Sequence, residues 1–301
     1  MLHCIHEENE TKLGGIPLNL RKTGLVLEGG AMRGLFTAGV LDVMMEHGIS
    51  YDGAIGVSAG AVFGSNYKSK QIGRAIRYNK RFCGDKRYGS LSSLIRTGDI
   101  YETKFCYETI PTKLDIFDAK TYRENPMEFY VTCTDLVTGK PVYHPCMKGD
   151  AEDIRWMQAS ASMPIVSKII HLDGYELLDG GISDSIPLKK IESMGYNRNV
   201  VILTQPLDFK KEKNKLLPIA RILLRKYPKV IQAIADRHIR YNETTAYIRK
   251  KELRGEVFVI RPPEALHISS TESNPEELER VYQLGRRTAM EVIDDLKAYL
   301  A

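Results

Sequence analysis

Two short motifs near the start of the chain carry groups that could perform acyl transfer. The first is a glycine turn that follows the apolar run 25–27 and consists of Gly29, Gly30, Ala31, Met32, Arg33 and Gly34. The second is a G-x-S-x-G motif that follows the apolar run 54–55 and consists of Gly56, Val57, Ser58, Ala59 and Gly60. A serine on a sharp strand-to-helix turn projects its hydroxyl from the end of a sheet, and small neighbours permit that turn. Ser58 is therefore the candidate nucleophile.

The glycine turn is the candidate site for binding a negatively charged oxygen. It lies between the strand pattern at 25–27 and a helical pattern at 35–47. Backbone N–H groups at a helix start have no acceptor within the helix, so they can hold an anion. An acyl hydrolase needs such donors for the oxyanion that forms when a nucleophile attacks an ester.

A serine nucleophile also needs a base, and histidine is the usual one. In an α/β-hydrolase the catalytic histidine follows the acid, in the chain order serine, acid, histidine. Only His238 and His267 follow the candidate acid Asp179, so these two histidines remain alternative bases. The preferred base is Asp179, because it ends the apolar pair 177–178 and precedes a turn of Gly180 and Gly181. A carboxylate there can reach a serine at the end of a neighbouring strand, and burial raises its pKa.

A second Asp-Gly pair lies close to Asp179. Asp173 and Gly174 stand between the apolar segments 167–172 and 175–178, which are typical of the two arms of a β-hairpin. Asp173 is therefore interpreted as a turn residue.

Together, the turn with Arg33, the Ser58 motif and the Asp179 turn resemble the patatin-like phospholipase family. Their order and spacing match across residues 24–181, and residues 159–164 (ASASMP) look like the segment before that family's aspartate. The resemblance implies a three-layer α/β/α fold and hydrolysis of lipid esters by a serine–aspartate dyad without histidine. It also implies that no metal or other cofactor is required.

In one position the chain departs from the family pattern. The family's loop usually begins with three glycines, and Ala31 stands at the third. We expect the amides of Gly29, Gly30 and Ala31 to form the oxyanion hole, with a negative φ at Ala31 because alanine disfavours positive values. Arg33 is expected to brace the loop, and the alternative is that it meets a lipid phosphate.

The order of the apolar segments predicts the fold class and a division of the chain. Strand, helix, strand and helix patterns alternate, which favours a mostly parallel sheet covered by helices on both faces. We expect a lead-in at 1–20, a patatin-like catalytic core at 21–205 and a mainly helical C-terminal extension at 206–301 that packs on the core. Residues 70–125 give only a weak pattern.

Composition narrows the class of protein. The chain has 301 residues, 43% of them hydrophobic, and a net charge of +5. It has no zinc-finger spacing and no dense basic stripe with aromatics, which argues against a nucleic-acid partner. Five scattered cysteines and an N-terminus without an apolar signal segment predict a cytoplasmic protein. No segment has the 18 or so apolar residues of a membrane span.

A basic segment at 210–227 (KKEKNKLLPIARILLRKY) is the candidate lipid contact. Its apolar residues fall on one side of a predicted helix: Leu216, Leu217, Ala220, Leu223, Leu224 and Tyr227. We expect this helix to pack on the core. The alternative is that it lies on an anionic membrane, which would place the protein at the inner membrane face.

The sequence therefore predicts a serine acyl hydrolase that cleaves lipid carboxylic esters, of the phospholipase A, lysophospholipase or lipid acyl hydrolase type. The alternatives are a general carboxylesterase or acyltransferase with the same site, and a weakly active regulatory protein that retains the pocket. The sequence does not decide the headgroup, the acyl position, the chain length or the oligomeric state.

Overall fold

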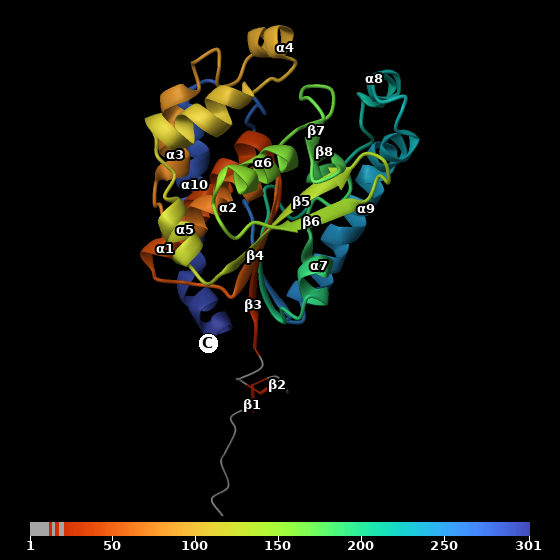
Figure 1. The fold of residues 1–301 in the computed structure, drawn as a ribbon. Helices are drawn as coiled ribbons and strands as arrows, with labels where there is room; N and C mark the ends of the chain where they lie inside the picture. Colours follow the sequence, from red (N-terminus) through yellow and green to blue (C-terminus); the bar gives the residue numbers. More distant parts are fainter. Residues whose placement is uncertain (1–11, 14–15, 18–20) are drawn as a thin grey trace, which may run out of the picture.

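The computed structural model describes residues 12–13, 16–17 and 21–301 (Figure 1). Most of the predicted lead-in at 1–20, including His3, Cys4 and His6, lies outside the described residues. Two short strands within it, β1 (Lys12–Leu13) and β2 (Ile16–Pro17), pair in antiparallel fashion.

The centre of the described molecule is an eight-stranded sheet with the order β10-β9-β3-β4-β5-β8-β7, in which β6 also pairs with β5. Its strands are β3 (Thr23–Leu27), β4 (Gly53–Val57), β5 (Glu128–Asp135), β6 (Pro141–Pro145), β7 (Ile170–Leu172), β8 (Tyr175–Asp179), β9 (Arg198–Ile202) and β10 (Val257–Ile260). The run from β10 to β5 is parallel. Strands β6 and β8 are antiparallel to β5. The mostly parallel sheet predicted from the sequence is thus confirmed.

Helices cover both faces of this sheet, as a three-layer fold requires. Their bounds are α1 (Gly34–Glu46), α2 (Ala59–Lys68), α3 (Arg74–Phe82), α4 (Leu91–Thr97), α5 (Ala119–Glu124), α6 (Ala151–Ser160), α7 (Leu188–Ser193), α8 (Leu217–Leu223), α9 (Pro228–Glu252) and α10 (Pro275–Leu300). Figure 1 shows α1, α2, α6 and α10 on one side of the sheet and α7 and α9 on the other. Three further helical segments are the 3-10 helices η2 (Ala31–Arg33) and η4 (Gly180–Ile182) and the π-helical η3 (Lys104–Leu114).

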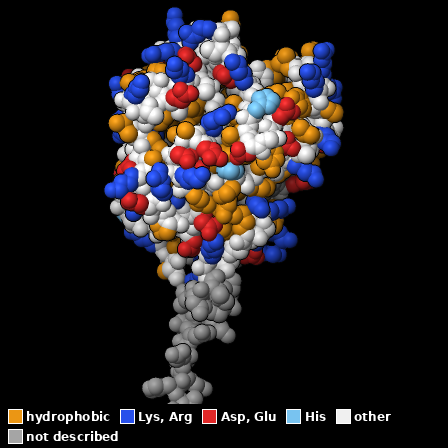
Figure 2. All heavy atoms as spheres, in the orientation of Figure 1, with side chains coloured by type: hydrophobic (Ala, Val, Ile, Leu, Met, Phe, Trp, Pro, Cys, Tyr) orange, Lys and Arg blue, Asp and Glu red, His pale blue; other side chains and the backbone are white. Residues whose placement is uncertain are grey.

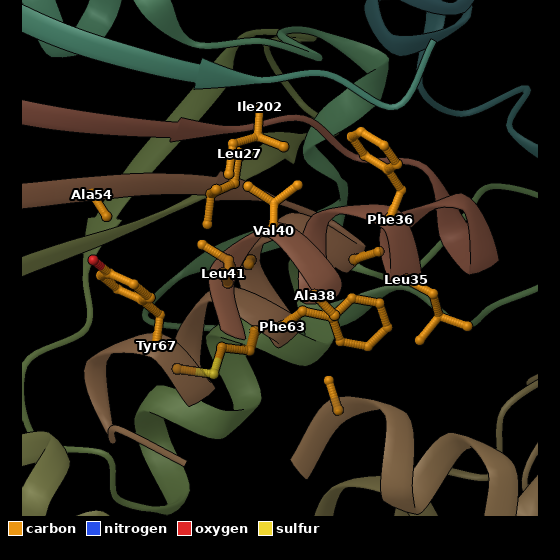
Figure 3. Close-up of a cluster of buried hydrophobic side chains, with 14 of the residues drawn as sticks. Leu27, Leu35, Phe36, Ala38, Val40, Leu41, Ala54, Phe63, Tyr67 and Ile202 are labelled. Atoms are coloured by element: carbon orange, nitrogen blue, oxygen red, sulfur yellow. The ribbon is translucent and has the colours of Figure 1, made fainter. Parts of the chain in front are cut away.

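The larger core lies between the sheet and the first of these helical layers. Leu27 and Ile202 of neighbouring strands meet Val40 and Leu41 of α1 there, and all four side chains are fully or almost fully buried (Figure 3). Helix α1 is itself covered by α10, because a Cβ on Gly285 would lie only 2.0 Å from the Phe36 carbonyl oxygen. Such backbone contact is open only to glycine. The C-terminal part of the chain therefore packs directly on α1.

The second core lies on the opposite face, under α7 and α9. It contains Val26, Ile55 and Val201 of the sheet together with Tyr196 and Tyr241. The strands are thus buried on both faces, which explains why they appear in the sequence as short continuous apolar runs. The C-terminal part also supplies β10 to the sheet edge, while the domain division at residue 205 stays a prediction.

The prediction of a single helix over residues 210–227 is wrong. Only α8 forms there, because Pro218 lies in its first turn and Pro228 begins the next helix. The expectation that its apolar residues share one buried side is also only half right. Ala220 and Leu224 are buried, whereas Leu216 and Leu223 are exposed.

Candidate active site

Ser58 occupies the tight turn between β4 and α2. Its backbone has φ 53° and ψ −123°, a conformation that costs a non-glycine residue about 1–3 kcal/mol. The turn is tight because α2 starts directly against the end of β3. A Cβ on Gly60 would lie 2.6 Å from the Leu27 carbonyl oxygen, and one on Gly56 would lie 2.7 Å from the Ala61 nitrogen. These contacts explain the two glycines of the motif.

Asp179 ends β8, and its side chain meets Ser58. The carboxylate forms a hydrogen bond with the Ser58 hydroxyl, and its Oδ1 accepts the Gly181 N–H at 2.7 Å. Burial raises the pKa of this carboxyl above its ordinary value. The bond to Ser58, the charge of Arg237 and the Gly181 N–H oppose that rise. The structure thus brings together the two side chains that the sequence singled out.

The end of α6 holds both members of this pair in place. Ser160 Oγ accepts the backbone N–H of Ser58 at 2.8 Å and donates its own proton to the Thr132 carbonyl at 2.6 Å. The carbonyl of Ser162 accepts the backbone N–H of Asp179 at 2.8 Å. This segment is part of the resemblance to the family, but the sequence predicts no role for Ser160. Its contact with Ser58 spans 102 residues, so no local pattern could report it.

The glycine turn passes next to Ser58. A Cβ on Gly29 would lie 3.0 Å from the Ser58 Cβ, and one on Gly30 would lie 2.7 Å from the Thr204 hydroxyl. The turn leads through η2 into α1, so the amides of Gly29, Gly30 and Ala31 precede the first α-helical turn. Gly34 packs against α2, where its Cβ would lie 2.7 Å from the Ala59 Cβ.

The negative φ expected at Ala31 is wrong, because the structure gives this residue a φ of +48°. The chain leaves an extended Gly30, with φ −172°, and must reverse at once into η2. Ala31 takes the left-handed conformation that a third glycine would adopt without steric cost.

Glu28, immediately before the turn, has no role that the sequence alone predicts. It is 2% exposed, and its carboxylate accepts the Thr204 N–H at 2.6 Å and the Tyr241 hydroxyl at 2.7 Å. Tyr241 lies on α9, so this carboxylate joins the glycine turn to the C-terminal part of the chain. Two hydrogen bonds thus satisfy the acceptor atoms of this buried side chain.

An apolar cavity of about 130 Å³ opens at Ser58 and Ala31. It lies between α2, α6 and η3. Its lining is mainly apolar and includes Met32, Val62, Phe63, Ile110, Met157 and Met163. A cavity of this character suits a hydrocarbon chain whose ester carbonyl sits at the nucleophile.

Neither of the two histidine alternatives lines the cavity at Ser58. His238 Nδ1 is 3.0 Å from the Ala235 carbonyl on its own helix, and the His267 side chain is exposed. Asp173 has φ 49° and Gly174 has φ 80°, which confirms the turn between β7 and β8.

Among the described residues, one cluster of three His, Cys, Asp or Glu side chains has its ligand atoms close enough together to hold a metal ion. The ligand atoms of His144, Cys146 and Asp153 lie within 4.8 Å of one another. This group sits at the first turn of α6, whereas Ser58 contacts the last residue of that helix. The absence of a metal requirement therefore stays a prediction.

Within the described residues, none of the helices is both long and apolar enough to span a membrane. Four cysteines, Cys83, Cys106, Cys133 and Cys146, are free.

The family model "Patatin-like phospholipase" matches residues 25–190, and a "Domain of unknown function (DUF6363)" matches residues 227–301. The "Uncharacterized protein YjjU" of Escherichia coli is 29% identical over 285 residues, which cover 91% of this chain and 79% of that protein. "Lysophospholipase nte1" of Aspergillus terreus is 29% identical over 184 residues, which cover 58% of this chain and 11% of that protein.

A solved structure with a similar course of the chain is that of VipD from Legionella pneumophila. It has a TM-score of 0.46 and 15% identity, and the match covers 91% of this chain and 67% of that one. The family model, by contrast, covers more than half of the sequence and includes the glycine turn, Ser58 and Asp179. The chain belongs to the patatin-like phospholipase family.

Proposed function

We propose that this protein hydrolyses carboxylic esters of lipids, as a phospholipase A, a lysophospholipase or a related acyl hydrolase. One observation carries the proposal: the Ser58 hydroxyl is hydrogen-bonded to the buried Asp179 carboxylate and lines an apolar cavity. Relatives named patatin-like phospholipase and lysophospholipase support a lipid substrate.

In the first half of the proposed reaction, Asp179 accepts the Ser58 proton while Oγ attacks the ester carbonyl. The amides of Gly29, Gly30 and Ala31 hold the oxyanion of the tetrahedral adduct. When the carbon–oxygen bond breaks, Asp179 returns the proton to the departing alkoxide. Loss of one oxyanion donor typically costs about 10²–10³ in rate.

In the second half, water replaces the alcohol. It gives a proton to Asp179 and attacks the acyl-serine carbonyl, and the same amides hold the new oxyanion. Collapse of this adduct releases the fatty acid, and Ser58 regains its proton from Asp179. A carboxyl whose pKa burial has raised is a stronger base than an exposed aspartate, so the dyad works without an imidazole.

The competing functions use the same site. A general carboxylesterase would prefer short esters, an acyltransferase would transfer the acyl group to an added alcohol, and a regulatory protein would turn over none. The apolar cavity favours long acyl chains over short ones.

Activity should therefore be measured side by side on a phospholipid, a triglyceride and short p-nitrophenyl esters. The proposal predicts fastest turnover of a lipid ester and loss of at least about 10³-fold in Ser58→Ala and Asp179→Asn. Folded variants that kept near wild-type rates would contradict it.

We also propose that α8 contacts an anionic lipid surface. Its exposed apolar side chains are Leu216, Ile219, Ile222 and Leu223, which are 45–72% exposed. Arg221, Arg225 and Lys226 flank them, and Figure 2 shows orange and blue side chains together at the corner where Figure 1 labels α8. Each basic residue near an anionic surface adds about 1 kcal/mol.

Co-sedimentation with vesicles tests this contact. We expect binding that rises with anionic lipid content and falls at least about 5-fold when Ile222 and Leu223 are both replaced by Asp. Met290→Asp is the matched control, because Met290 is 49% exposed on the distant helix α10. Binding that ignored both anionic lipid and the α8 substitution would remove the membrane contact, and with it the proposed inner-face location.

A further inference from the structure

Three side chains with metal-ligand chemistry meet where the chain passes from β6 to α6. His144 lies on β6, Cys146 directly follows that strand, and Asp153 lies in the first turn of α6. Their imidazole, thiol and carboxylate ligand atoms lie within 4.8 Å of one another. Cys146 is fully buried and Asp153 is 4% exposed, whereas His144 is half-buried. The group is therefore enclosed by the protein except at the histidine.

Neighbouring groups orient these ligands and leave a ligand atom of each one available. Asp153 Oδ2 accepts two backbone N–H groups of the preceding loop, at 2.6 and 2.7 Å, while Oδ1 accepts no hydrogen bond from the described residues. The His144 ring stacks on Trp156, with centroids 3.9 Å apart and planes at 7°, and its nitrogens form no hydrogen bond with the described part of the chain. Cys146 Sγ makes one weak contact of 3.9 Å, to the Asp153 carbonyl oxygen. Such outer contacts are what a metal site uses to hold its ligands in position.

The charge around the group is mainly negative. Three acidic side chains and one lysine act on His144: Asp153, Glu152, Asp173 and Lys148. Figure 2 shows red acidic side chains gathered where Figure 1 labels α6. Burial outweighs these acids and lowers the pKa of His144, so its imidazole is neutral at pH 7 and has a lone pair for a metal. Burial raises the pKa of the Cys146 thiol, so a metal that binds must displace the thiol proton.

The three types of ligand select the metal. Ca²⁺ and Mg²⁺ prefer oxygen ligands alone, whereas a thiolate, an imidazole and a carboxylate together suit Zn²⁺. Tetrahedral zinc with bonds of about 2.0–2.3 Å places its ligand atoms roughly 3.3–3.7 Å apart. The group must therefore contract by about 1 Å to close on the ion. His144, the least buried of the three, can make this movement.

We propose that His144, Cys146 and Asp153 bind one Zn²⁺ ion, with water as the fourth ligand. The ion joins the end of β6 to the first turn of α6. Ser160, which contacts Ser58, lies at the other end of the same helix, so the ion takes no part in the proposed ester hydrolysis.

Trp156 provides a local signal for this site, because it is the only tryptophan of the chain and stacks on His144. The probe is Co²⁺, which accepts the ligands of Zn²⁺, quenches tryptophan fluorescence at short range and absorbs in the near ultraviolet when a thiolate is bound. The full chain is first treated with a chelator, and circular dichroism checks that it stays folded. We expect Co²⁺ to quench Trp156 until one equivalent is bound, with a Kd of about 1 µM or below. Added Zn²⁺ should reverse the quenching.

The local signal is needed because the chain has other metal-binding side chains. His3, Cys4 and His6 lie close together in the sequence, so the metal content of the protein does not by itself locate an ion. Quenching of Trp156 reports the proposed site alone.

Substitutions then assign the ligands. His144→Gln, Cys146→Ser and Asp153→Asn should each weaken Co²⁺ binding at least about 10-fold, which is the effect of losing even an outer contact of a metal site. Asp153→Asn keeps an oxygen for the two loop N–H groups, so it tests the ligand charge with little change to the fold. His171→Gln is the matched control, because His171 is an exposed histidine on β7 outside the group.

Saturable quenching that is lost in the ligand variants and kept in His171→Gln would support the zinc site. Folded wild-type protein whose Trp156 fluorescence does not respond to Co²⁺ would overturn it, even if metal were bound elsewhere in the chain. Quenching that survives both His144→Gln and Cys146→Ser would overturn it as well. None of these outcomes depends on ester hydrolysis, so the proposed function stands or falls separately.

Discussion

The backbone N–H of Ser58 donates a 2.8 Å hydrogen bond to the side-chain oxygen of Ser160. Ser160 in turn donates to the Thr132 carbonyl of β5 at 2.6 Å, and the neighbouring Ser162 carbonyl holds the Asp179 N–H. One turn of chain at the end of α6 therefore fixes both members of the proposed dyad. Ser160 is fully buried, so its hydroxyl cannot exchange these partners for water.

Ser160→Ala should lower kcat about 10-fold and change KM much less. The substitution leaves the Ser58 N–H and the Thr132 carbonyl without a partner, at a cost of about 1–3 kcal/mol, and frees the nucleophile to leave its reactive geometry. Steady-state kinetics on a short p-nitrophenyl ester measure both constants. Ser193→Ala on the exposed side of α7 is the control. A change confined to KM would contradict a positioning role for Ser160.

The raised pKa of Asp179 predicts how activity and stability depend on pH. Only the ionised carboxylate can accept the Ser58 proton, so the rate should fall with decreasing pH at values above the ordinary aspartate pKa of 3.8. A pH–rate profile on an uncharged ester tests this. A profile that stayed flat down to pH 4 would contradict it.

The contribution of Asp179 to stability depends on pH in the opposite direction to the activity. Because folding raises the pKa of Asp179, the stability that this group contributes is fully present below its unfolded value and is lost as pH rises through its folded value. Asp179→Asn removes that loss, so its Tm should exceed the wild-type Tm at pH 7. The difference should disappear near pH 3. A lower Tm for the variant at pH 7 would show that the buried charge is stabilised by its partners.

The apolar cavity predicts chain-length selectivity. Val62 lines it from α2, so Val62→Trp should fill part of it. We expect kcat/KM for a long-chain p-nitrophenyl ester to fall at least about 10-fold relative to the acetate ester. Met290→Trp on the exposed side of α10 is the control. Equal effects on short and long esters would place the acyl chain elsewhere.

The left-handed backbone at Ala31 predicts a stabilising substitution. Alanine with φ 48° costs about 1–2 kcal/mol, whereas glycine costs about 0.5–1 kcal/mol through its freedom in the unfolded chain. Ala31→Gly should therefore raise the free energy of unfolding by up to about 1 kcal/mol, measured by chemical denaturation. Ala38→Gly inside α1 should lower it instead. A loss of stability in both variants would contradict the conformation at Ala31.

The turns around the site could be predicted because their glycines report close approach of backbones. Gly60 meets the Leu27 carbonyl and Gly180 would place a Cβ 2.1 Å from the Thr132 carbonyl, so each glycine marks a crowded point of the sheet edge. The buried strands were equally readable as short apolar runs bounded by turns. The fold class followed from their order.

The features of the site that could not be predicted from the sequence depend on contacts between distant segments of the chain. Ser160 reaches Ser58 over 102 residues, and Tyr241 reaches Glu28 over 213 residues. Neither pair has a local signature. Arg237 is likewise one of many basic residues in a helical pattern until the fold brings it beside Gly181. The φ of Ala31 was mispredicted because residue preference was weighed without the sharp reversal that the turn imposes.

Labelling with a fluorophosphonate probe tests most directly whether the Ser58 hydroxyl is an activated nucleophile. The probe reacts with an activated serine whatever the natural substrate. We expect wild-type protein to be labelled at Ser58, Ser58→Ala to show no labelling, and Asp179→Asn to react at least about 100-fold more slowly. Labelling that persists in folded Ser58→Ala, or that is unaffected by Asp179→Asn, would contradict the Ser58–Asp179 dyad.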